Sequence, residues 1–147
     1  NDRRDGFVPS RMVSERVPMS MNGRSVVLVV EDETSVRDLM TTVLRAQGYV
    51  VLEAADAAAA LEVVRRGETI DVLVTDVVMP GMGGRELAER VLRDDPRVRV
   101  LFVSGYSHEA ETANGSLLPG ADYLAKPFAP DTLAARVRRL AERTPVA

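Results

Sequence analysis

The chain has 147 residues, of which 46% are hydrophobic and 28% are charged, and its formal net charge at pH 7 is −3. This composition is typical of one globular domain and excludes a disordered or fibrous chain. A net negative charge supplies no global field to hold nucleic acid, and the absence of cysteine excludes disulfides and thiolate metal sites, as suits a cytoplasmic protein. No apolar run approaches the roughly 20 residues that cross a bilayer, so no direct membrane contact is expected.

The first elements can be read from hydrophobic periodicity. Residues 1–24 show no sustained period and are predicted to be a linker or N-terminal tail, whereas the folded domain is predicted over 25–145. Residues 26–30 form an unbroken apolar run, which predicts a strand buried on both faces. Helical spacing and a glycine stop at Gly48 then predict a helix whose apolar stripe is Val36, Leu39, Met40, Val43 and Leu44.

The strand and helix pattern repeats along the rest of the chain. Further strands are predicted at 49–52, 70–75, 98–103 and 123–125. The helix after His108 is expected to be short, because Gly115, Pro119 and Gly120 interrupt the chain. The other helices are predicted from these apolar faces: Ala57, Ala60, Leu61 and Val64; Leu87, Ala88, Val91 and Leu92; Leu133, Val137, Leu140 and Ala141. Five strands alternating with five helices predict an α/β fold with a doubly wound, five-stranded parallel sheet.

Polar side chains stand where the predicted strands end, at Glu31, Asp32, Asp76, Ser104 and Lys126. Taken singly, each has an ordinary explanation: a helix cap, a turn or a solvated surface charge. Lys126, however, is the only lysine beside 18 arginines. In a parallel sheet, ligands bind beyond the carboxyl ends of the strands, so all five residues are predicted to meet at one edge.

Three carboxylates in one crevice repel each other, which implies a bound divalent cation. Mg²⁺, or Mn²⁺ in its place, suits hard oxygen ligands and commonly bridges carboxylates to phosphate. Asp76 would then attack phosphorus to form an acyl phosphate, while the metal and Lys126 spread the charge on the phosphoryl oxygens. Ser104 would donate a hydrogen bond to one of those oxygens.

Four segments resemble, in the same order, the signature segments of response-regulator receiver domains, which have a flavodoxin-like fold. They are Val-Val-Glu-Asp-Glu (29–33), Val-Thr-Asp-Val-Val-Met-Pro-Gly-Met-Gly-Gly (74–84), Phe-Val-Ser-Gly-Tyr (102–106) and Leu-Ala-Lys-Pro-Phe (124–128). The resemblance, which covers about 25–143, implies that a histidine kinase or phosphotransfer domain phosphorylates Asp76. It implies the following further roles: metal ligands Glu31, Asp32, Asp76 and the backbone carbonyl of Val78; switch residues Ser104 and Tyr123; and Lys126 on the phosphoryl group.

The resemblance carries further expectations. The Lys126-Pro127 bond is expected to be cis, and a downstream protein, or a second copy in a homodimer, is expected to bind the face of the last two helices and fifth strand. Val78 and Tyr106 border the approach of water to the phosphoryl group, and both are expected to obstruct it, so self-dephosphorylation should be slow. The chain departs from the commonest pattern in having glutamate as the first acid and serine instead of threonine at 104.

Several alternatives stay open. Residues 102–123 look most like receivers at the C-terminus of hybrid sensor histidine kinases, but a free-standing regulator starting near Met19 or Met21 is the alternative. A Mg²⁺-dependent phosphatase with an aspartyl nucleophile needs a second acid two residues later, where this chain has Val78. A dinucleotide-binding domain needs a glycine-rich turn after its first strand. A receiver fold that has lost phosphorylation would lack an acid or the lysine, and His108 is best explained as a solvated loop residue.

Overall fold

The computed structural model describes residues 24–105, 118 and 120–142, and its strands form one sheet. The strands are β1 (Val26–Val30), β2 (Val50–Ala54), β3 (Val72–Asp76), β4 (Arg99–Ser104) and β5 (Asp122–Ala125), and their spatial order is β2-β1-β3-β4-β5. Every neighbouring pair is parallel. The predicted doubly wound, five-stranded parallel sheet is therefore confirmed.

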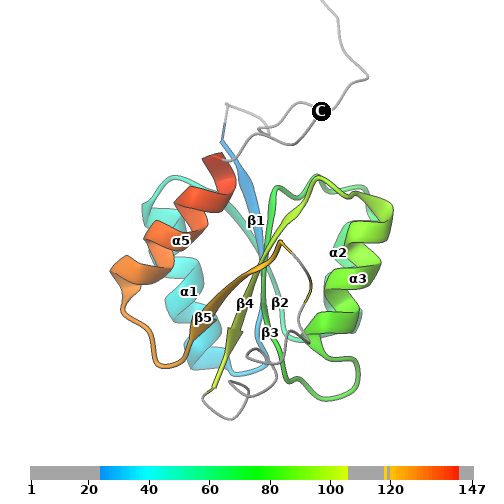
Figure 1. Ribbon diagram of the computed structural model, residues 1–147, viewed down its shortest axis with the longest axis horizontal. Coiled ribbons are helices and arrows are strands. Elements are labelled where there is room, and N and C mark those ends of the chain that lie inside the picture. Colours follow the sequence, from blue (N-terminus) through cyan, green and yellow to red (C-terminus); the bar gives the residue numbers. More distant parts are fainter. Residues whose placement is uncertain (1–23, 106–117, 119, 143–147) are drawn as a thin grey trace, which may run out of the picture.

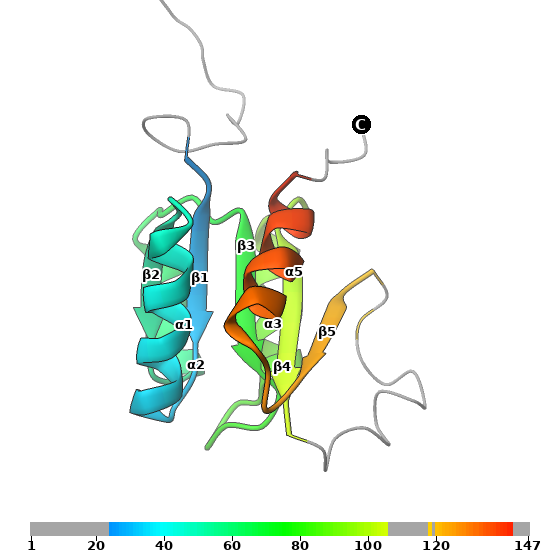
Figure 2. The same ribbon diagram turned by 90° about the vertical axis from the view of Figure 1, so that its left-hand side faces the viewer.

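Helices cover both faces of the sheet (Figures 1 and 2). Helices α1 (Thr34–Ala46) and α5 (Pro130–Glu142) lie on one face, and α2 (Ala57–Arg65) and α3 (Gly84–Asp94) lie on the other. The short helix expected after His108 falls outside the described residues. Among the residues that the structure describes, none of the helices has the length and apolarity required to span a membrane.

Two separate apolar cores explain the uninterrupted hydrophobic run of β1. Successive side chains of a strand point to opposite faces, so Leu28 and Val30 pack with α2 and α3, while Val27 and Val29 pack with α1 and α5. All five residues of β1 are buried. Because every side chain of this central strand meets a helix layer, the strand shows no polar alternation in the sequence.

The predicted stripe of α1 is wrong at one edge. Leu39 is 42% exposed, whereas Thr41, which was not predicted to face the core, is buried. The buried face centres on Met40 and Leu44, and Leu39 lies about 140° around the helix from Leu44. Burial of Thr41 is tolerated because its hydroxyl donates a hydrogen bond to the backbone carbonyl of Asp38.

The bounds of β1 are as predicted, and the ends of the other strands differ from the predicted bounds by at most two residues. The difference matters most at β3, which ends at Asp76 itself, so this residue still pairs in register with Val103 of β4. The side chain at 76 is thus held by a sheet position at the carboxyl edge. Gly48 and Gly67 follow the C-cap residues of α1 and α2 and have positive φ angles of 97° and 87°, as expected of residues that end helices.

Candidate functional site

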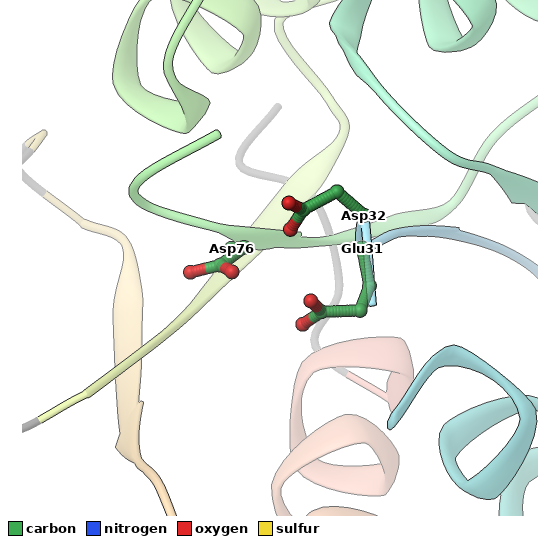
Figure 3. Close-up of side chains that lie close together, drawn as sticks. All are labelled: Glu31, Asp32 and Asp76. Atoms are coloured by element: carbon green, nitrogen blue, oxygen red, sulfur yellow. The ribbon is translucent and has the colours of Figure 1, made fainter. Parts of the chain in front are cut away.

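The carboxylates of Glu31, Asp32 and Asp76 gather where β1 and β3 end (Figure 3). One oxygen from each lies within 4.8 Å of the others. Glu31 is 1% exposed and Asp76 is 7% exposed, whereas Asp32 is open to solvent. The sequence prediction that these three acids meet at one sheet edge therefore agrees with the structure.

Lys126 joins the acids from the segment that follows β5. Its Nζ donates hydrogen bonds to Oε1 of Glu31 at 2.8 Å and to Oδ2 of Asp76 at 3.2 Å. Its own backbone N–H donates to the carbonyl of Ser104 at 2.7 Å, and the Lys126-Pro127 bond is cis, as expected. The only lysine of the chain is thus placed between the two buried acids.

Glu31 is the most enclosed member of the site, and both of its carboxylate oxygens have partners. While Oε1 accepts from Lys126, Oε2 accepts from the backbone N–H of Glu33 at 3.1 Å. Burial raises the pKa of the Glu31 carboxyl, and the charge of Asp76 adds to the effect, although both hydrogen bonds oppose it.

The pKa of Lys126 is raised as well. Burial alone would lower it, but the hydrogen bond to Glu31 and the negative charges of Asp76 and Glu31 outweigh that effect. A raised pKa for both the acid Glu31 and the base Lys126 is expected in a partly buried site that holds more negative than positive charge. Lys126 therefore stays an ammonium at neutral pH.

Ser104 and Tyr123 contact each other beside the acids. The Ser104 hydroxyl is fully buried at the end of β4 and donates to the Tyr123 hydroxyl at 2.9 Å. Tyr123 of β5 pairs in register with Phe102 of β4, and Tyr123 is partly exposed. The two residues predicted to act as a pair are therefore hydrogen-bonded to each other.

The loop after β3 carries Val78. The side chain of Val78 is largely exposed, with 53% of the residue accessible, and its backbone N–H donates to Oδ1 of Asp76 at a long 3.4 Å. Tyr106 and His108 lie outside the described residues.

Two residues that sequence reasoning missed support this edge of the sheet. A Cβ atom on Gly84, the first residue of α3, would lie 2.0 Å from the carbonyl oxygen of Asp76. Arg37 of α1 donates from Nη1 to the carbonyl of Glu31 at 2.7 Å. The adjacent glycines at 83 and 84 could have indicated a close backbone approach, whereas no sequence signal links an arginine to a carbonyl six residues earlier.

Comparisons with known proteins agree with this geometry. Residues 27–138 match the model of the response regulator receiver domain. Sensor kinase CckA of Brucella abortus is 37% identical over 124 residues, which are 84% of this chain and 13% of that protein. Aerobic respiration control protein ArcA of Escherichia coli K12 is 35% identical over 118 residues, 80% of this chain and 49% of that protein.

A solved receiver domain from the hybrid histidine kinase CckA superposes with a TM-score of 0.68 at 35% identity and covers 80% of this chain and 100% of that domain. The match to the receiver model extends from β1 into α5 and includes all five strands. The chain belongs to the response regulator receiver domain family of two-component signalling.

Proposed function

We propose that this domain accepts a phosphoryl group on Asp76 from the phosphohistidine of a histidine kinase or phosphotransfer domain, in a reaction that depends on Mg²⁺ or Mn²⁺. The observation that carries the proposal is the position of Asp76. Its carboxylate lies within 4.8 Å of two further acids and within 3.2 Å of a lysine ammonium, at the carboxyl edge of a parallel sheet. This is the edge where ligands of such sheets bind.

The donor set fits a small hard cation. Three carboxylates and one ammonium leave two negative charges, and oxygen atoms are the ligands that Mg²⁺ prefers. Glu31, Asp32, Asp76 and the backbone carbonyl of Val78 are proposed to hold it, with exposed Asp32 facing the side from which an ion can enter. When bound, the ion would neutralise charge on the transferring phosphoryl group.

The chain's own residues then have distinct roles. An oxygen of Asp76 forms a bond to phosphorus while the bond from phosphorus to the donor's imidazole nitrogen breaks, and the electron pair stays on that nitrogen. Lys126 is already charged and lies close enough to turn its Nζ from Glu31 towards the new phosphoryl oxygens. Its role is to stabilise the added negative charge.

Signal output is proposed to begin at Ser104. A phosphoryl oxygen on Asp76 is a stronger acceptor than the phenol oxygen of Tyr123, to which the Ser104 hydroxyl now donates. Breaking that hydrogen bond releases Tyr123, which lies on β5 beside α5. We propose that the face of the last two helices and the fifth strand, of which the structure describes α5 and β5, binds the downstream partner, or a second copy of the chain.

The lifetime of the acyl phosphate is proposed to be long. Val78 stands two residues beyond Asp76 with an exposed side chain that can neither donate nor accept a hydrogen bond, so it cannot orient an attacking water.

The matched segment makes up a small part of a sensor kinase and about half of ArcA, and both settings are candidates for this domain. We favour attachment to a hybrid histidine kinase acting in the cytoplasm, with a free-standing regulator as the alternative.

Phosphorylation by a small donor tests the proposal. Acetyl phosphate with Mg²⁺ is expected to add one acid-labile phosphoryl group to the wild-type domain and none to Asp76→Asn. Asp56→Asn, which changes an exposed carboxylate at the start of α2, is the matched control and should label like wild type. Equal labelling of Asp76→Asn, or full labelling in excess chelator, would reject the proposal, and continuous release of phosphate from a phosphomonoester would favour a phosphatase.

A further inference from the structure

We infer that Arg37 is a positioning residue for the metal-binding acids, because its guanidinium fixes the peptide that joins Glu31 to Asp32. The inference rests on the proposed function, since it concerns how this chain prepares its acids for a divalent cation. Arg37 lies in the first turn of α1, and its side chain is only 17% exposed.

The peptide between Glu31 and Asp32 is where β1 gives way to the loop. The N–H of Glu31 still donates to the carbonyl of Ala54 at 3.1 Å, which continues the pairing of β1 with β2. Its carbonyl has left the sheet and accepts instead from Nη1 of Arg37 at 2.7 Å. That carbonyl belongs to the same planar peptide as the N–H of Asp32, so holding it sets the direction in which Asp32 leaves the strand.

Besides the carbonyl of Glu31, the guanidinium contacts a carboxylate. Nε of Arg37 lies 3.4 Å from Oε1 of Glu53 in β2. The backbone N–H of Arg37 donates to the carbonyl of Glu33 at 2.9 Å, as part of helix α1. Two different edges of the planar guanidinium therefore contact two different elements. A lysine would keep the charge but could not hold both contacts in one geometry.

Arg45 supplies an internal comparison. It lies two turns later on the same helix, pairs with the other oxygen of Glu53 at 3.4 Å and donates to the carbonyl of Val51 at 3.1 Å. It therefore ties α1 to β2, as Arg37 does. Only Arg37 also reaches the backbone at the acidic site, so the two residues separate a general structural role from a positioning role.

Charge and positioning predict opposite effects on cation binding. A fixed positive charge beside a cation site opposes binding, so if Arg37 acted only through its charge, its removal would tighten Mg²⁺ binding. If Arg37 orients the acids, its removal weakens Mg²⁺ binding despite the lost repulsion. Loss of the partners that orient metal-binding groups typically lowers metal affinity about 10- to 100-fold.

The experiment titrates the folded domain with MgCl₂ by calorimetry and follows the Glu31 carbonyl and Asp32 amide by NMR. Arg37→Met is expected to bind Mg²⁺ about tenfold more weakly than wild type, and Arg37→Lys to be weakened as well. Arg45→Met should stay within about twofold of wild type. In the absence of metal, the Glu31 carbonyl resonance should shift in both Arg37 variants and stay in place in Arg45→Met.

Each other result counts against the inference. Unchanged or tighter Mg²⁺ binding by both Arg37 variants, or equal weakening by Arg45→Met, overturns it while leaving the proposed function intact. Absence of Mg²⁺ binding by the wild-type domain overturns the proposed function together with the inference. If Arg37→Met fails to fold, Arg37→Lys, which keeps the charge, decides by the same criteria.

Discussion

Gly84 should be the glycine that the site tolerates least, because α3 begins against the backbone of Asp76. In Gly84→Ala the new Cβ would lie 2.0 Å from the carbonyl oxygen of Asp76, 3.0 Å from its carbonyl carbon and 3.2 Å from Oγ1 of Thr75. Real Cβ atoms essentially never approach closer than 3.0 Å, so either α3 or the end of β3 must move by about 1 Å. The two nearest atoms belong to the backbone of Asp76 and not to the flexible end of a side chain.

The cost can be worked out from two opposing effects. Overpacking that forces a backbone shift costs about 3 kcal/mol. Replacing glycine by alanine in a helix stabilises the folded state by about 1 kcal/mol, because alanine has the higher helix propensity and makes the unfolded chain less flexible. The free energy of unfolding should therefore fall by about 2 kcal/mol, which for a domain of this size lowers Tm by about 8 °C.

Urea unfolding followed by far-UV circular dichroism measures this difference, since the chain has no tryptophan. Gly105→Ala is the control: a Cβ there meets no atom within 4 Å, so stability should stay within about 0.5 kcal/mol. Because the displaced backbone carries Asp76, phosphorylation of Gly84→Ala by acetyl phosphate should also slow at least about tenfold. If Gly84→Ala were as stable and as reactive as Gly105→Ala, the close packing of α3 on the acceptor residue would be the wrong explanation.

Three further predictions concern the switch, the lifetime and pH. The free energy of unfolding of Lys126→Arg should lie within about 1 kcal/mol of the wild-type value. On phosphorylation, however, the amide resonances of β5 and α5 should shift much less than in wild type, because a planar guanidinium does not replace a compact ammonium. Shifts as large as those of wild type would contradict this. Val78→Asn should shorten the half-life of the phosphorylated domain at least about threefold without changing its Mg²⁺ dependence, and an unchanged half-life would argue against shielding. Burial would raise the pKa of Asp122, but the hydrogen bond from Arg139 at 2.7 Å and other positive partners hold it below its ordinary value. A carboxyl whose pKa is lowered by folding stabilises the folded state at every pH above the pKa of the unfolded chain. Asp122→Asn should therefore lower the free energy of unfolding by about 1 kcal/mol near neutral pH, and this loss should shrink as pH falls below about 4. A loss that does not change with pH would refute the assignment.

Much of the fold could be predicted because its sequence signals are local. The five-residue apolar run of β1, the glycines after α1 and α2, and the polar residues at strand ends each report on the backbone around them. Parallel topology then requires the carboxyl ends to share one edge, which predicts that Glu31, Asp32, Asp76 and Lys126 lie together. The cis Lys126-Pro127 bond, in contrast, came from family resemblance alone.

The features that could not be predicted depend on tertiary contacts, which produce no periodic pattern in the sequence. Leu39 matches the apolar stripe of α1 but lies outside the buried face, because the position of that face is set by β2 and α5 packing on Met40 and Leu44. The contact of Arg37 with the Glu31 carbonyl depends on how α1 is rotated above the sheet. An arginine among 18 in the sequence gives no hint of such a contact.

The central claim is that Asp76 carries the phosphoryl group, and chemical trapping tests it directly. The domain is phosphorylated with acetyl phosphate and Mg²⁺, reduced with borohydride, digested and sequenced by mass spectrometry. Reduction of an aspartyl acyl phosphate gives homoserine, so the account predicts homoserine at position 76 and unmodified aspartate at position 32. Homoserine at another acid, phosphate on His108, or no modification at all would contradict it.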